Sequence, residues 1–132
     1  MLSERQTMDL VEAAFLGKQH AYSPYSNFPV GAALLCGNGT IVTGASIDNM
    51  SYGATICAER TAIVKAVSDG MKSFVALAIV ANVEHISPCG LCRQVIAEFC
   101  APEMPVLLVP GDYSEERNGG LKVTTVGELL PE

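Results

Sequence analysis

Two short cysteine motifs, each at the start of a predicted helix, constrain the fold of this chain more than any other feature. The first reads CAE at residues 57–59 and the second reads PCGLC at residues 88–92, with the apolar run 74–81 between their helices. A continuous apolar strand is typical of a sheet that is covered on both faces. In a strand–helix–strand–helix order, both helices begin at the carboxyl ends of strands. We therefore expect the two motifs to meet at one end of a sheet.

The other segments predict the rest of an α/β domain. Ser3 and Gln6 have the spacing of a capping box, and a helix is expected from there to about Lys18. Strands are expected over residues 30–36, 40–46, 74–81, 106–109 and 121–124, and further helices over 57–68, 89–99 and 126–130. The first two strands form a predicted hairpin at the GNG turn, residues 37–39. The chain is predicted to be one domain over residues 1–132, a three-layer α/β/α structure with a central mixed five-stranded sheet.

The composition is more apolar than a free monomer of this size needs. Hydrophobic residues make up 49% of the 132 residues and charged residues 17%, and the mean hydropathy is +0.32. The best candidate for a membrane span, residues 74–83, has about half of the roughly 20 residues that a bilayer requires. We therefore expect no membrane insertion and a homo-oligomer that covers the excess apolar surface.

The net charge and the first ten residues limit the possible ligands and the expected location of the protein. The net charge is −6 and the isoelectric point is about 4.8, which disfavours polymeric nucleic acid as a ligand. The first ten residues, MLSERQTMDL, contain charges and no apolar signal core. A cytoplasmic location is the expectation.

The cysteines predict a metal site. Five cysteines without a secretory signal argue against a disulfide framework. Cys89 and Cys92, three residues apart at a helix start, direct their thiols to one side, and Cys57 begins the other helix. Three thiolates around a tetrahedral zinc ion leave a fourth position open, which is the mark of a catalytic site. Water bound there becomes a nucleophile near neutral pH.

Two charged residues follow Cys57 closely. Glu59 has the position of a general acid and base that moves protons between this water and a leaving amine. A Cys or His with a nearby Glu, followed by Pro-Cys-x-x-Cys, is the pattern of zinc deaminases. Arg60 is expected to donate hydrogen bonds to the sulfurs and to offset part of their negative charge.

A lone Cys-x-x-Cys pair has two other interpretations: it could be a redox-active pair or half of a structural zinc site. If the pair were redox-active, Cys57 and Glu59 would have no explained role. A closed structural site needs a fourth ligand. The other candidates for that ligand all lie outside the two motifs: Cys36, Cys100, His20 and His85.

The chain resembles the small homotetrameric cytidine deaminases of pyrimidine salvage. The similar segments are AYSPYSNFPVGAALL, GASIDNMSYGATICAERTAIVKAVSDG, ISPCGLCRQVIAEF and TVGELLP, which together span nearly the whole chain. The resemblance implies hydrolytic deamination of cytidine and 2′-deoxycytidine to uridine and 2′-deoxyuridine with release of ammonia. It also implies one Zn²⁺ per subunit and a homotetramer whose active sites are shared between subunits.

The resemblance also assigns roles to single residues. By position, Cys57, Cys89 and Cys92 match the zinc ligands, and Glu59 matches the proton carrier. Phe28 matches the aromatic side chain that packs against the pyrimidine, although a plain core position is an alternative for it. The other matches are Ala58, whose backbone contacts the base, and Tyr25 and Tyr52, which match aromatic residues near subunit contacts.

One departure from the family concerns the sugar. The family usually has Asn-x-Glu before the zinc helix, and those side chains hold the ribose hydroxyls. Ser46 and Asp48 stand at the matching positions, and both side chains are shorter. A buried hydroxyl without its partner costs about 1–3 kcal/mol. We expect Ser46 and Asp48 to bind the sugar more weakly, through water, or to bind another group.

This departure leaves other functions open. One is a sibling deaminase of a modified cytosine nucleoside such as blasticidin S, with the same zinc chemistry. Another is a non-catalytic, zinc-stabilised oligomeric binding protein, which Glu59 argues against. A polynucleotide deaminase is disfavoured by the acidic charge and by the lack of a basic, aromatic-rich channel.

Overall fold

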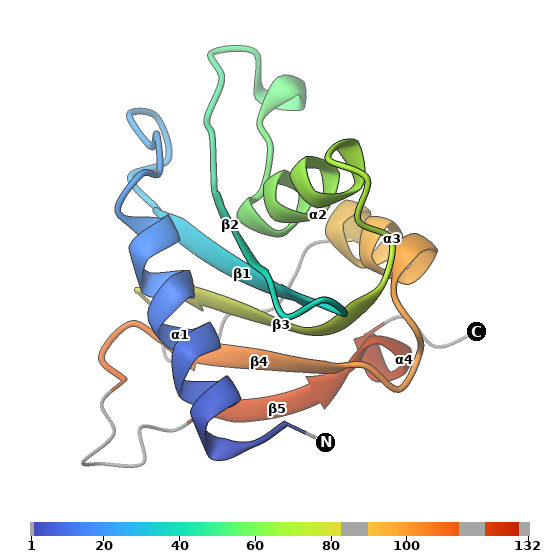
Figure 1. The fold of residues 1–132 in the computed structure, drawn as a ribbon. Helices are drawn as coiled ribbons and strands as arrows, with labels where there is room; N and C mark the ends of the chain where they lie inside the picture. Colours follow the sequence, from blue (N-terminus) through green and yellow to red (C-terminus); the bar gives the residue numbers. More distant parts are fainter. Residues whose placement is uncertain (1, 83–89, 114–120, 130–132) are drawn as a thin grey trace.

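The computed structural model describes residues 2–82, 90–113 and 121–129, which form one five-stranded sheet with helices on both faces (Figure 1). The helices and strands are α1 (Glu4–Lys18), β1 (Val30–Cys36), β2 (Ile41–Ala45), the 3₁₀ helix η1 (Tyr52–Ala54), α2 (Ala58–Ser68), β3 (Phe74–Ala81), α3 (Gly90–Phe99), β4 (Pro105–Pro110), β5 (Lys122–Thr125) and α4 (Val126–Leu129).

The sheet is mixed, as predicted. The strand order is β2-β1-β3-β4-β5, and β3 and β4 are the parallel pair. The other neighbours are antiparallel, including the predicted hairpin of β1 and β2. The observed strands differ from the predicted ones by one residue at several ends. Strand β4 is one residue longer at each end than predicted. The two added residues are Pro105 and Pro110, because proline, which has no N–H group, is tolerated at the ends of a strand.

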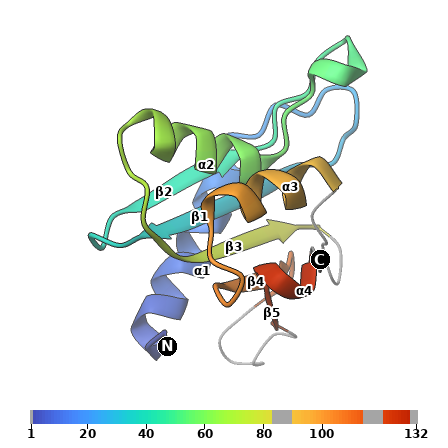
Figure 2. The same cartoon turned by 90° about the vertical axis from the view of Figure 1, so that its right-hand side faces the viewer.

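The helices divide the core into two layers. Helix α1 lies on one face of the sheet and α2 and α3 lie on the other (Figures 1 and 2). Strand β3 is buried from Ala76 to Ala81, and its side chains alternate between the two core clusters on the two faces. The three-layer prediction is therefore confirmed for the described residues.

The ends of the first two helices follow their sequence signals. The Ser3 hydroxyl accepts a hydrogen bond from the Gln6 N–H at 3.0 Å, and Gln6 Oε1 accepts one from the Ser3 N–H at 2.9 Å. This is the predicted capping box. Helix α2 ends at Ser68 with Asp69 as its C-cap, and the next residue, Gly70, adopts a positive φ of 91° that residues with a side chain rarely accept.

Helix α2 is held against the sheet by a close backbone approach. A Cβ atom at position 44 would lie 2.4 Å from the Ala58 carbonyl oxygen and 2.5 Å from the Ala62 nitrogen. Only glycine therefore allows the first turn of α2 to pack this closely on β2. Gly44 thus fixes the start of the helix that carries the first motif.

The longest helix within the described ranges is α1, with 15 residues. No helix in this part of the chain combines the length and the apolar character that crossing a bilayer requires.

Candidate active site

Helices α2 and α3 both begin at the end of the sheet where β3 ends (Figure 2). Cys57 is the N-cap residue of α2, and Cys92 lies in the first turn of α3. Cys92 hydrogen-bonds with Glu59, the second residue of α2. The two motifs therefore meet at one end of the sheet, as the strand–helix order predicts. Cys89, the third predicted sulfur ligand, lies outside the described residues.

Glu59 is a carboxylate enclosed by protein, with 4% of its surface exposed. Burial raises the pKa of Glu59 to about 7, because the charged form loses its hydration, and the nearby Cys57 raises it further. Hydrogen bonds with its own backbone and with Cys92, together with the charge of Arg60, act in the opposite direction. A carboxyl group with this pKa gives and takes protons readily at neutral pH.

Arg60 interacts with both described sulfurs. Its Nη2 donates to the Thr55 carbonyl oxygen at 3.2 Å and to Cys57 Sγ at 3.8 Å. Burial alone would lower the pKa of Arg60, but its interactions with Cys57 and Cys92 outweigh burial and raise it. The Nε of Arg60 is buried and has no hydrogen-bond partner among the described residues. A positive charge is thus held beside two sulfurs.

These residues fit a zinc ion. Thiolates are preferred zinc ligands, and a neighbouring guanidinium offsets the charge of a sulfur-rich ligand set. Within residues 2–82, 90–113 and 121–129, no group of three Cys, His, Asp or Glu side chains could hold a metal ion. The third sulfur ligand that the sequence predicts, Cys89, lies outside these ranges.

A pair of loops extends from the same end of the sheet (Figures 1 and 2). Ile47 pairs with Tyr22 on one side and with Ile56 on the other. Since Ile56 directly precedes Cys57, the segment 46–48 links the loop 22–29 to the start of α2. Phe28 lies in that loop and is 38% exposed. The alternative of a core position for Phe28 is therefore wrong for this structure.

Ser46 and Asp48 are both 7% exposed; the Ser46 side chain binds the first residue of β1, and the Asp48 side chain binds the loop 22–29. The Ser46 hydroxyl accepts a hydrogen bond from the Val30 N–H at 3.0 Å. Asp48 Oδ2 accepts from the backbone N–H groups of Ser26 at 2.9 Å and Tyr25 at 3.2 Å. The bond from the Ser26 N–H is the main cause that lowers the pKa of Asp48.

The sequence reasoning missed this anchoring role and missed Ser26. The Ser26 hydroxyl lies 3.2 Å from Asp48 Oδ1 and accepts from the Phe28 N–H at 3.1 Å. A serine in a turn commonly accepts a hydrogen bond from the backbone N–H two residues later in the chain. This tendency was the sequence signal that could have indicated the contact between Ser26 and Phe28.

The other predicted residues take different positions. Ala58 is fully buried at the start of α2, where Gly44 packs against it. The Tyr25 side chain is exposed. Tyr52 begins η1, and its side chain lies outside what the structure describes.

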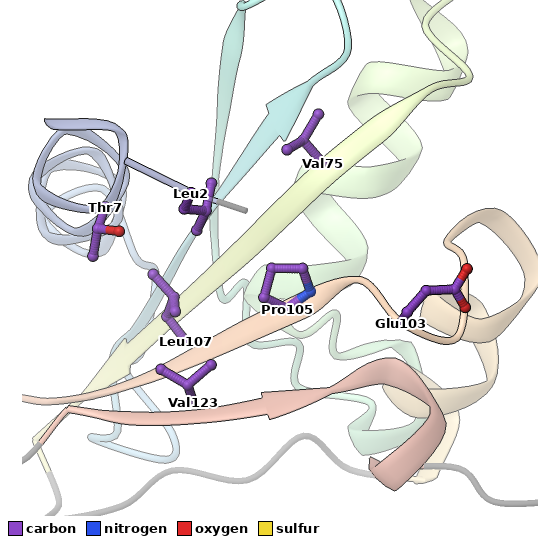
Figure 3. A pocket seen from close by; sticks show the side chains of 7 residues that line it. All are labelled: Leu2, Thr7, Val75, Glu103, Pro105, Leu107 and Val123. Carbon is purple, nitrogen blue, oxygen red and sulfur yellow. The ribbon is translucent and has the colours of Figure 1, made fainter. Parts of the chain in front are cut away.

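A separate hollow lies on the α1 face of the sheet and has a volume of about 430 Å³ (Figure 3). It is lined by Leu2, Thr7, Val75, Glu103, Pro105, Leu107 and Val123. None of these belongs to the cysteine motifs or to the loop 22–29, so this hollow is not part of the candidate active site.

Comparison with known proteins identifies relatives along nearly the whole chain. Residues 4–108 match the family model of the cytidine and deoxycytidylate deaminase zinc-binding region. A cytidine deaminase of Sporosarcina psychrophila is 54% identical over 123 residues, which cover 92% of this chain and 86% of the relative. A cytidine deaminase of Halalkalibacterium halodurans is 46% identical over 123 residues, which cover 92% of this chain and 89% of the relative. The crystal structure of a cytidine deaminase from Burkholderia pseudomallei has a TM-score of 0.88 and 40% identity, and the match covers 99% of this chain and 98% of that one.

Proposed function

Because this chain belongs to the zinc-binding cytidine and deoxycytidylate deaminase family, we propose that it hydrolyses cytidine and 2′-deoxycytidine to uridine and 2′-deoxyuridine and releases ammonia. The observation that carries the proposal is the buried Glu59 carboxyl, with a pKa of about 7, next to Cys57 and Cys92. A structural zinc site does not require a buried carboxyl group beside its sulfur ligands, so a non-catalytic binding protein is disfavoured. The two cytidine deaminases at 54% and 46% identity favour cytidine over a modified nucleoside.

Zn²⁺ is the cofactor, and we assign Cys57, Cys89 and Cys92 as its ligands. When bound, zinc acidifies water and supplies the nucleophile near neutral pH. Arg60 compensates the negative charge of the sulfurs through its contact with Cys57.

Glu59 performs the proton transfers. It accepts a proton from the nucleophilic water and donates a proton to N3 of the cytosine ring, which makes C4 electrophilic. After the water oxygen has bonded to C4, Glu59 takes the remaining proton of the new C4 hydroxyl and delivers it to the 4-amino group, which leaves the C4 carbonyl of the product. The C4–N bond then breaks, and the amine leaves as ammonia. Burial of Glu59 supports this role, because a pKa near 7 suits both directions of transfer.

The base and the sugar are bound by residues of the two loops and the start of α2. Phe28, whose ring is partly exposed, packs against the pyrimidine, and the Ala58 backbone contacts the base. Asp48 Oδ1 accepts one hydrogen bond within the described residues, from Ser26, so a carboxylate lone pair is left for a sugar hydroxyl. The Ser46 hydroxyl accepts from Val30 and retains its own hydrogen for donation.

The assembly is proposed to be a homotetramer of single domains, each comprising residues 1–132. Apolar side chains cluster on the two loops at the active-site end, and exposed apolar surface of this kind is typical of an interface. The exposed members are Tyr22, Tyr25, Phe28, Ile47, Met50 and Ile56. Tyr25 and Tyr52 are the proposed subunit contacts next to the shared active sites. Light scattering on the purified protein tests the tetramer. A cytoplasmic location stays a prediction from the sequence.

Ammonia release tests the function. Purified, zinc-loaded protein is assayed in parallel with cytidine, 2′-deoxycytidine, cytosine and blasticidin S, and Glu59→Gln serves as the inactive control. Turnover of the two nucleosides is the expected result. Turnover of blasticidin S alone would move the assignment to a sibling deaminase, and no turnover of any substrate would reject the deaminase proposal.

A further inference from the structure

We propose that Ser26 is a positioning residue, whose hydroxyl connects Asp48 to the backbone of Phe28 and so sets the position of the Phe28 ring. The catalytic consequence of this connection rests on the proposed function, because it requires that the ring packs against the pyrimidine. The connection itself is a property of the loop 22–29.

The direction of the two hydrogen bonds is fixed by chemistry. Asp48 Oδ1 is an acceptor when ionised, so the Ser26 hydroxyl donates its hydrogen across the 3.2 Å separation. The hydroxyl lone pairs then remain for the Phe28 N–H, whose nitrogen lies 3.1 Å from Ser26 Oγ. A bond to a charged group is stronger than one between neutral groups. The carboxylate therefore fixes the rotation of the hydroxyl that holds Phe28.

The loop 22–29 contains one residue with a left-handed backbone conformation. Asn27 has a φ of 54°, in the left-handed region, which asparagine adopts more often than other residues with a side chain. The Asn27 N–H donates to the Ser23 carbonyl at 3.0 Å, which closes the turn. Asn27 stands between Ser26 and Phe28, so the Ser26–Phe28 bond spans this turn residue.

Core packing does not place the Phe28 ring. The side chain is 38% exposed, so its position depends on the backbone that carries it. The two flanking residues, Asn27 and Pro29, provide no hydrogen bond of their own to the segment 46–48 among the described residues. The Ser26 hydroxyl is thus the side-chain connection between Phe28 and that segment.

Backbone hydrogen bonds connect Asp48 and its neighbour Ile47 to the residue that precedes Cys57 in the proposed metal site. The Asp48 N–H donates to the Tyr22 carbonyl at 2.8 Å. One residue earlier, Ile47 exchanges two backbone hydrogen bonds with Ile56, at 2.8 and 2.9 Å. Ile56 precedes Cys57, the N-cap of α2. The path from the Phe28 backbone to the start of α2 therefore contains only hydrogen bonds and adjacent peptide units.

The first test measures the loop and needs no activity. Amide exchange with water at Phe28 is measured by NMR in the wild type and in Ser26→Ala, Ser26→Thr and Ser23→Ala. We expect at least threefold faster exchange at Phe28 in Ser26→Ala and wild-type exchange in Ser26→Thr, which keeps the hydroxyl. Ser23→Ala is the matched control, since Ser23 Oγ is buried without a hydrogen-bond partner among the described residues. Unchanged exchange in Ser26→Ala would overturn the connection.

The second test measures catalysis with cytidine. Loss of the hydroxyl is expected to lower kcat/KM about threefold to tenfold, mainly through KM, which is the range for one lost hydrogen bond. The loss should disappear when Phe28 is already alanine, because Ser26 then has no ring to position. An equal loss in both backgrounds would show a merely structural role and overturn the proposal. If the wild type deaminates nothing, the function proposal fails, and the exchange measurement still decides whether the connection exists.

Discussion

The Arg60 guanidinium lies 3.8 Å from the Cys57 sulfur, within the first turn of the helix that also carries Glu59. The same Nη2 atom holds the Thr55 carbonyl at 3.2 Å, which fixes the side chain against the backbone just before Cys57. This arrangement places a positive charge next to the Cys57 sulfur.

Arg60→Gln should therefore weaken zinc binding while the fold is kept. Removal of groups that support metal ligands typically costs about tenfold to a hundredfold in metal affinity. Zinc transfer to a competing chelator measures this loss, with circular dichroism as the control for folding. Wild-type zinc affinity together with a wild-type rate would contradict the role assigned to Arg60.

Glu59→Gln should slow turnover strongly and leave zinc bound. A glutamine has nearly the same shape but cannot carry a proton, so the rate is expected to fall by about a hundredfold to ten-thousandfold. The measurements are kcat with cytidine and the zinc content per subunit. A rate within a few fold of the wild type would remove Glu59 from the mechanism.

Zinc removal should destabilise the protein as well as inactivate it. A metal that binds only the folded state adds stability according to its concentration and affinity. Dialysis against a chelator should lower the melting temperature, and added Zn²⁺ should restore it. Cys92→Ser should resemble the zinc-depleted wild type and respond little to added metal. An equal response of both proteins to zinc would argue against Cys92 as a ligand.

The sequence predicted the parts of the structure that depend on local pattern. The capping box at Ser3 and the buried strand β3 each have a signal within a few residues. The meeting of Cys57 with the second motif followed from the strand–helix order, because both helices begin at the carboxyl ends of strands. These features need no knowledge of side-chain contacts.

The hydrogen bonds of the loop 22–29 could not be predicted in the same way. Ser26 and Asp48 are far apart in the sequence, and their contact depends on how two loops lie next to each other. The position of Asp48 suggested a ligand for the sugar, whereas its described partners are Tyr25 and Ser26. A short polar side chain gives no sequence signal that separates a loop anchor from a substrate ligand.

Gly44→Ala should destabilise the protein, because the new methyl group would lie 2.4 Å from the Ala58 carbonyl oxygen. Forcing a group into a packed helix–sheet contact typically costs about 1–3 kcal/mol. The free energy of unfolding from denaturant titration measures it. Gly53→Ala is the control, because a Cβ atom there meets no atom within 4 Å. Equal stabilities of the two variants would show that α2 moves away from β2 without cost.

Because of Asp48, the free energy of unfolding of the protein should decrease as the pH falls into the acid range. Hydrogen bonds from Ser26 lower the pKa of Asp48 in the folded protein below its unfolded value of about 3.9. A group with a lowered folded pKa adds stability above its unfolded pKa and loses it as the pH falls through the folded pKa. Asp48→Asn, which does not titrate, should therefore lose less stability than the wild type as the pH is lowered below about 4. Denaturant titrations from neutral to acid pH measure both slopes, and identical slopes would mean that the Asp48 carboxylate gains nothing from Ser26 on folding.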